Sequence, residues 1–173
     1  MTVHMPDLSK PLLAADRAFG EIDPNDVQTA PLRRGLALWQ DLRGARLFPA
    51  RARMSPRALG TLLRHTILIK VLDNGAEFQI RIIGDAIMAV HSDPIQGLTM
   101  AEINTMLPGY GDMLHQLYSK CCEIKRPLAF RGEFRREPDQ RVFHREHLLV
   151  PLGEADEAVD YLISFLVYSQ PQS

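Results

Sequence analysis

The stretch TILIKVLDNGAEFQIRIIG, residues 66–84, decides the fold because it predicts two strands joined by a tight turn. Residues 67–69, 71 and 72 are apolar and largely β-branched, as in a buried strand, and residues 77–82 alternate polar and apolar side chains. The intervening DNG at residues 73–75 supplies asparagine and glycine, which tolerate the positive φ that a hairpin loop requires. An isolated hairpin is only marginally stable in water, so the fold must contain further strands.

Three more strand-like runs come late in the chain, at residues 128–136, 142–152 and 158–168. The last run is apolar on both faces, which predicts a place in the middle of a sheet. Between the hairpin and these runs, the pattern predicts short helices and then one longer helix over residues 110–125. The chain therefore places two strands before a helical segment and three strands after it.

Composition narrows the class of protein. The chain has 173 residues, of which 46% are hydrophobic and 24% charged, as in an ordinary globular domain with a core. A net charge of -1 gives no electrostatic reason to bind nucleic acid. No apolar run approaches the roughly 20 residues that span a bilayer, and the N-terminus lacks a secretory pattern. We expect a cytoplasmic protein without a nucleic-acid or membrane partner.

The sequence divides into four parts. Residues 1–28 contain prolines and little periodicity, which predicts a loose arm. Residues 29–65 predict a helical extension, residues 66–168 the core domain, and residues 169–173 a tail.

The extension contains an apolar stripe at helical spacing, formed by Leu32, Leu36, Trp39 and Leu42. Such a stripe must be buried somewhere, either against the parent domain or against another subunit. Both readings stay open from the sequence, and the second makes these four residues a candidate interface.

Five arginines follow within one short segment: Arg43, Arg46, Arg51, Arg53 and Arg57. Guanidinium groups bind carboxylates and phosphates well, so an anion site is one interpretation. A charge run alone is weak evidence, and we favour arginines that pair locally with acids and carbonyls.

The order of elements is that of a PAS domain. Short stretches support this resemblance in order and spacing: LRGARLFPAR after Trp39, then SPRALGTLL, RIIG, QGLTMAEI and EHLLVPL. Over residues 32–168 they resemble a family of compact bacterial stand-alone PAS proteins. The resemblance implies an α+β fold, with a five-stranded antiparallel sheet and helices on one face, plus the N-terminal helical extension. It also implies a sensory or adaptor module in signal transduction.

Two functional hypotheses follow from this resemblance. In the first, a small apolar metabolite binds between the sheet and the helices. In the second, the core is filled and the domain only docks to a protein partner or forms a homodimer. We expect no enzyme, because the chain has no serine elbow, phosphate loop or dinucleotide fingerprint.

A ligand cavity would be walled by apolar side chains from the inner faces of the sheet and helices. The candidate residues are Ile80, Ile82, Ile87, Met88, Met106, Tyr110, Met113, Leu117, Phe130, Phe134, Leu148 and Phe165. The alternative is that these residues fill the core completely, as in most protein interiors.

Two charged residues in expected half-buried strands form a candidate polar pair, Arg81 and Glu146. Unpaired buried charges are costly, so each needs a partner or a polar ligand. We favour mutual or local pairing over ligand contact.

No cofactor and no metal are predicted. Flavin-binding PAS relatives carry an asparagine-cysteine-arginine-phenylalanine motif, whereas residues 103–113 here read INTMLPGYGDM, without cysteine. The only cysteines, Cys121 and Cys122, come later. Haem ligation through His115 is disfavoured because one histidine beside an apolar stripe is a weak signal.

Overall fold

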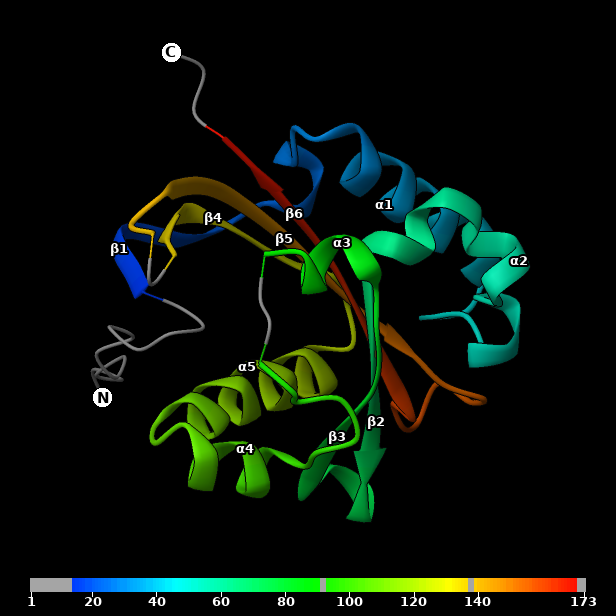
Figure 1. Ribbon diagram of the computed structural model, residues 1–173. Helices are drawn as coiled ribbons and strands as arrows, with labels where there is room; N and C mark the ends of the chain where they lie inside the picture. Colours follow the sequence, from blue (N-terminus) through cyan, green and yellow to red (C-terminus); the bar gives the residue numbers. More distant parts are fainter. Residues whose placement is uncertain (1–13, 91–92, 137–138, 171–173) are drawn as a thin grey trace.

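The computed structural model describes residues 14–90, 93–136 and 139–170 of the chain. Its centre is one six-stranded antiparallel sheet in the order β1-β4-β5-β6-β2-β3 (Figure 1). The strands are β1 (Ala14–Ile22), β2 (Thr66–Leu72), β3 (Glu77–Ile83), β4 (Leu128–Arg135), β5 (Val142–Leu152) and β6 (Tyr161–Ser169). Strand β6 pairs with both β5 and β2, so the last strand lies centrally and joins the hairpin to the C-terminal strands, as predicted.

The sixth strand is the main difference from the expected sheet. Residues 14–22, predicted as part of a loose arm, form the edge strand β1 beside β4, with Ile22 opposite Ala129. The stretch AADRAFGEI lacks β-branched residues until its last position, so its own sequence gives little strand signal. Its pairing comes from the open edge of β4 instead. Residues 1–13 and 171–173 lie outside the described part of the chain.

The predicted hairpin forms as β2 and β3, and its turn is a short 3-10 helix. Three consecutive residues there have positive φ: Asp73 at 49°, Asn74 at 56° and Gly75 at 94°. Asparagine, aspartate and glycine are the residues that adopt this conformation at least cost, which explains the composition of the turn.

The ladder between β2 and β3 contains a bulge. Leu68 pairs with Ile82, but the next residue, Ile69, pairs with Ile80, so Arg81 is an extra residue in β3. The extra residue shifts the alternation of the strand, so Ile80 and Ile82 face opposite sides of the sheet.

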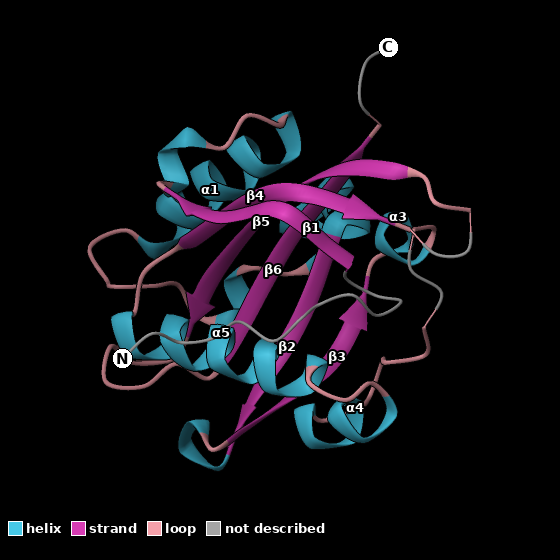
Figure 2. Cartoon of the chain, turned by 90° about the vertical axis from the view of Figure 1, so that its left-hand side faces the viewer, coloured by secondary structure: helices cyan, strands magenta, loops and turns pink. Residues whose placement is uncertain are grey.

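Helices cover both faces of the sheet (Figure 2). One face carries α4 (Met100–Met106) and α5 (Tyr110–Ile124), with α3 (Asp85–Met88) following β3. The N-terminal extension covers the other face with α1 (Ala30–Arg43) and α2 (Pro56–Leu59). Short 3-10 helices lie at Pro24–Asp26, Arg51–Arg53, Gly60–His65 and Asp73–Gly75.

Local sequence explains how α4 begins and how α5 packs against it. Thr99 and Glu102 form a complete capping box at the start of α4, as their spacing predicts. Gly111 lets α5 lie close to α4, because a Cβ there would be 2.1 Å from the carbonyl oxygen of Met100. The two helices therefore act as one packed unit over β3.

The stripe of α1 packs against the sheet of its own chain. Leu32, Leu36 and Trp39 are buried, and Leu42 is half-buried against the same core. The indole Nε1–H of Trp39 donates a hydrogen bond to the carbonyl oxygen of Pro151 in β5 (2.8 Å). The interface hypothesis for these four residues is therefore wrong, because the outer sheet face already covers the stripe.

Most of the arginine-rich segment after α1 is engaged locally, as predicted. Arg46 donates to the carbonyl oxygen of Gly153 (2.7 Å), and Arg43 donates to the carbonyl oxygen of Arg46 (2.9 Å). The guanidinium of Arg51 lies over the ring of Tyr161, 5.1 Å from its centroid. These contacts fix the loop on the sheet.

Candidate ligand-binding cavity

A cavity of about 400 Å³ lies between the inner sheet face and α5, bordered by α3 and β3. This volume falls within the range of about 300–1,000 Å³ that is typical of small-molecule sites. Most of its wall is apolar and comes from Ile67, Ile80, Ile83, Ile87, Ile95, Met113, Leu114, Leu117, Phe130 and Leu166.

Seven of the twelve predicted wall residues line this cavity: Ile80, Ile87, Met88, Tyr110, Met113, Leu117 and Phe130. Four others do not. Ile82 and Met106 are exposed, while Leu148 and Phe165 are fully buried elsewhere. The side chain of Phe134 lies outside the described part of the chain.

The wrong assignments have two physical causes. The bulge at Arg81 turns Ile82 to the outer face, toward Leu68 and Leu59 beneath α2, and brings Ile83 to the cavity. Strand β6 and the second half of β5, residues 148–152, are apolar on both faces, so alternation could not show which face each of these residues occupies.

The pair Leu148 and Phe165 illustrates this ambiguity. They are cross-strand partners on the outer face, where Phe165 packs against Gly35 of α1. Met106 is the last residue of the short helix α4 and points to solvent.

Sequence reasoning missed the polar part of the cavity wall. Arg145 and His147 of β5, with Ser164 and Tyr168 of β6, all line the cavity from the sheet. Arg145 is the cross-strand partner of Tyr168 and forms a side-chain hydrogen bond with it. The Nε2 atom of His147 lies 2.6 Å from the hydroxyl of Ser164. The available signal was the run of four polar residues at 144–147, which interrupts the apolar pattern of β5.

Burial sets the protonation of these groups. Desolvation, followed by the nearby Arg145 charge, lowers the pKa of His147 to about 3, so its imidazole is neutral at pH 7. Desolvation also raises the pKa of Tyr168 to about 12, and burial raises those of Tyr110 and Tyr118. Protonated phenols and a neutral imidazole therefore accompany the cationic guanidinium of Arg145.

The outer part of the cavity is more solvated. Glu21 of β1 and Lys120 of α5 form an ion pair there (2.6 Å), and both side chains are about half exposed. Asp93, which precedes the short loop to α4, also lines the cavity and is half-buried. The acidic groups of the wall are thus less buried than Arg145, which is 5% exposed.

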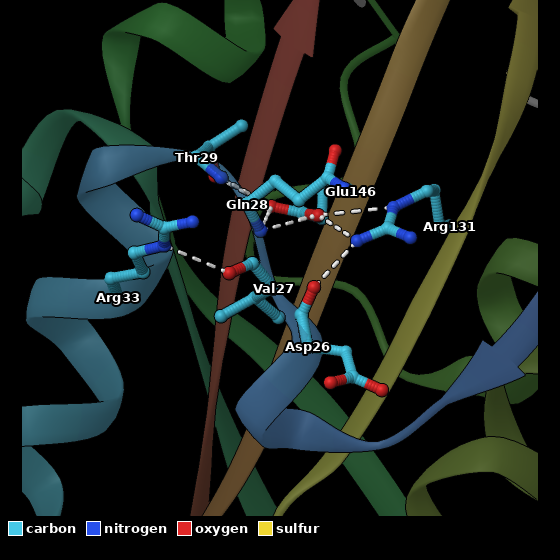
Figure 3. Close-up of polar contacts among 7 residues, drawn as sticks. All are labelled: Asp26, Val27, Gln28, Thr29, Arg33, Arg131 and Glu146. Carbon is cyan, nitrogen blue, oxygen red and sulfur yellow. Dashed lines mark hydrogen bonds and ion pairs between the residues drawn. The ribbon is translucent and has the colours of Figure 1, made fainter.

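Glu146, between the two cavity residues of β5, faces the opposite side of the sheet and joins α1 to it (Figure 3). Its carboxylate accepts hydrogen bonds from the backbone N–H groups of Gln28 (2.9 Å) and Thr29 (2.8 Å) and from the Thr29 hydroxyl (2.8 Å). Arg131 of β4 donates to the same carboxylate (3.0 Å) and to the carbonyl oxygen of Asp26 (2.6 Å).

These contacts keep Glu146 charged. Burial favours its neutral form, but the hydrogen bonds from Thr29, Gln28 and Arg131 outweigh burial and lower its pKa. The negative charge also lies at the positive end of the α1 dipole. The hydroxyl of Thr29 therefore bonds to Glu146 and does not cap its own helix.

The predicted pair of Arg81 and Glu146 does not exist. Arg81 is exposed at the bulge and donates a hydrogen bond to the side chain of Gln79 (3.1 Å). Strands β2 and β6 separate β3 from β5, which keeps the two side chains apart. The expectation of local pairing is confirmed for Glu146, whose partner is Arg131.

The residues considered for cofactors lie outside the cavity wall. His115 contacts the carbonyl oxygen of Ala76 through Nε2 (2.8 Å) and packs edge-on against Phe78. Cys121 is buried and Cys122 half-buried; burial raises both thiol pKa values, that of Cys122 to about 11. Neither cysteine lines the cavity.

Two broader searches cover only the described ranges. Within residues 14–90, 93–136 and 139–170, no three histidine, cysteine, aspartate or glutamate residues group as a metal site. In the same part of the chain, no helix has the length and apolar character needed to cross a membrane.

Comparison with known proteins identifies the family. A family model described as a PAS domain (PAS_5) matches residues 21–167, and the chain therefore belongs to this PAS family. The six-stranded sheet with α4 and α5 on its inner face is the expected fold with one strand added. No curated protein matches the chain.

Several solved structures are similar to the chain at low sequence identity. The LOV protein of Rhodobacter sphaeroides is 14% identical, with a TM-score of 0.42, over 60% of this chain and 57% of that one. The PAS domain of an HTR-like protein from Haloarcula marismortui is 18% identical, with a TM-score of 0.39, over 68% and 94%. An RNA-binding light-oxygen-voltage receptor is 11% identical, with a TM-score of 0.42, over 90% and 39%.

These likenesses support no statement about ligands or partners. The chain spans only 57% and 39% of the two light-oxygen-voltage proteins, and RNA binding is a property of the second one. The absence of a nucleic-acid partner stays an expectation from net charge. Family membership rests on the match over residues 21–167.

Proposed function

We propose that this PAS domain is a sensory module that binds a small, mainly apolar molecule in the cavity between the sheet and α5. The observation that carries the proposal is the cavity itself, about 400 Å³ of space with an apolar wall and a few polar groups at the sheet. Protein interiors normally contain few voids larger than a water molecule, so a space of this size is suited to a ligand.

The character of the wall supports the same conclusion. Met88 and Met113 border the cavity, and methionine side chains adapt to varied apolar shapes. Convergent polar groups in an otherwise apolar cavity give orientation and specificity to a bound molecule.

A pure interaction module with a filled core is the second hypothesis, and it has less support. The space beside α5 argues against a filled core, and the α1 stripe proposed for docking is buried against β5 and β6. A protein partner or homodimer, and a bacterial, cytoplasmic setting, stay part of the proposal as expectations from the sequence.

We propose no catalytic role. His147 and Ser164 are close enough to resemble a base and a nucleophile. A histidine with a pKa of about 3 is a weak base at neutral pH, far from the value that general-base catalysis favours. Their contact instead fixes the orientation of the imidazole at the wall.

The test uses two neighbouring residues on opposite sheet faces. Ile83 lines the cavity and Ile82 does not, so Ile83→Phe should fill the space while Ile82→Phe should leave it open. Protein purified from its native host is examined by native mass spectrometry and extraction, and thermal shift is measured with a panel of apolar metabolites.

We expect a bound compound, or a ligand that stabilises the wild type by about 2.7 kcal/mol at 100 times its Kd. Ile83→Phe should weaken its binding at least about tenfold, and Ile82→Phe should not. Ligand-free protein without any thermal shift, or equal effects of the two variants, would overturn the proposal.

A further inference from the structure

We infer that the ligand carries a carboxylate, which binds Arg145 at the sheet, while its apolar body points toward α5. This inference rests on the proposed function and names the chemical class of the ligand. It excludes neutral hydrocarbons and alcohols as the preferred occupants.

The position of Arg145 is the first observation. Its side chain is 5% exposed, comes from the middle of the sheet and lines the cavity. The neighbouring Tyr168, its cross-strand partner, hydrogen-bonds to it and thereby orients the guanidinium. An arginine held in this way presents a planar fork of N–H donors, which matches the two oxygens of a carboxylate.

The neighbouring polar groups are the second observation. Ser164 and His147 line the cavity on the same sheet face as Arg145. His147 lies two residues after Arg145 in β5. With His147 neutral, Arg145 supplies the positive charge of this group, and the hydroxyl and imidazole can hydrogen-bond to carboxylate oxygens.

The distribution of charge with depth is the third observation. The described wall contains two acids, Glu21 and Asp93, and two bases, Lys120 and Arg145. Glu21 and Lys120 pair with each other at the exposed mouth, and Asp93 is only half-buried. Charge interactions are strongest where water is excluded, so the buried Arg145 dominates the selection of a ligand.

The remaining wall fits an apolar body. Ile80 and Ile83 of β3, with Met113 and Leu117 of α5, face the cavity from two further sides. A medium-length aliphatic or aryl-alkyl carboxylate would place its charged end at β5 and its body among these side chains.

The experiment compares isosteric ligands on the full chain. Octanoate is tested against octanamide, and 4-phenylbutyrate against 4-phenylbutyramide, by isothermal titration calorimetry at pH 7.5. We expect each carboxylate to bind the wild type at least about tenfold more tightly than its amide, as charge-assisted hydrogen bonds are stronger than neutral ones.

Variants assign the preference to Arg145. Arg145→Met keeps the approximate length of the side chain and removes its charge. The ratio of carboxylate affinity to amide affinity should therefore fall to about one. Asp93→Asn removes a charge of the opposite sign at the less buried part of the wall, and it should keep or increase the preference for the carboxylate. If Arg145→Met does not fold, Tyr168→Phe replaces it and should reduce the ratio by a smaller factor, about threefold.

The outcomes separate the two proposals. Equal binding of acid and amide, blocked by Ile83→Phe, would overturn the carboxylate inference and leave the sensory cavity intact. A preference unchanged in both Arg145→Met and Tyr168→Phe would also overturn it. Absence of binding by both ligand series and by the metabolite panel would count against the cavity function itself.

Discussion

The two faces of the sheet are both apolar, yet α1 packs closely on one of them at Gly35 and the other encloses a cavity of about 400 Å³. On the outer face, Leu32 of α1, Leu148 of β5 and Phe165 of β6 are all fully buried. Gly35 allows this close approach, because a Cβ there would be 2.9 Å from the ring of Phe165. On the inner face, Met113 and Leu117 of α5 border open space instead. The close approach of α1 at Gly35 therefore contrasts with the space left beside α5.

Strand β5 belongs to both layers. Side chains alternate along a strand, so Arg145 and His147 face the cavity, while Glu146 between them holds the start of α1. Three successive residues thus divide ligand contact and helix attachment between the two faces.

The largest expected difference between the faces comes from truncating one large side chain on each. Trp39→Ala should lower the free energy of unfolding by about 3–5 kcal/mol, because it removes a buried side chain and its hydrogen bond to Pro151. Leu117→Ala should cost about 1 kcal/mol, since Leu117 is half-buried and already borders space. Urea unfolding measures both values. Equal losses would mean that the two layers are equally well packed.

A smaller loss of unfolding free energy should come from the contacts of Glu146 that attach α1 to the sheet. Glu146→Gln should lower the free energy of unfolding by about 2 kcal/mol, because it removes the charge that accepts the N–H groups of Gln28 and Thr29. Arg131→Met should cost about 1 kcal/mol or less, as its side chain is 38% exposed.

A double-mutant cycle in urea divides these two contributions. The coupling energy should stay below about 1 kcal/mol, because most bonds to Glu146 come from the backbone. Coupling as large as the whole Glu146→Gln loss would instead assign the attachment to the ion pair.

The third effect is a pH dependence of the free energy of unfolding, which comes from His147 on the cavity face. The unfolded chain binds a proton at His147 near its ordinary pKa of about 6.5, whereas the folded chain does so only near 3. Stability should therefore fall as pH drops from about 6.5 toward 3, by up to about 1.4 kcal/mol per pH unit from this residue. Glu146, with its lowered pKa, adds a loss at the acidic end.

Two histidine variants test this slope by urea unfolding between pH 7 and 5. His147→Gln should remove most of it. His144→Gln, at the half-exposed neighbour on the outer face, should leave it unchanged. An unchanged slope in His147→Gln would show that the imidazole is hydrated and titrates normally.

The sequence was sufficient for elements with strong local signals. The DNG turn and the longer helix over residues 110–125 formed where predicted, and the spacing of Thr99 and Glu102 matches the capping box of α4. The edge strand β1 was missed because its pairing depends on β4, far along the chain.

The cavity was only partly predictable for a related reason. Helical and alternating patterns located seven wall residues. In a strand that is apolar on both faces, the pattern does not show which residues face the cavity. Arg145 and Ser164 could be placed at the cavity only once the register of β5 against β6 was known. The polar end of the site is therefore a product of strand pairing, not of local sequence.

The bulge at Arg81 also affects how the length of this hairpin can change. In a regular strand, gaining or losing one residue turns every later side chain to the wrong side. Here the surplus residue already sits outside the ladder, so its removal would leave Ile80 and Ile83 directed inward as before. Arg81 thus marks the point in β3 where a change in chain length can be absorbed without inverting the strand.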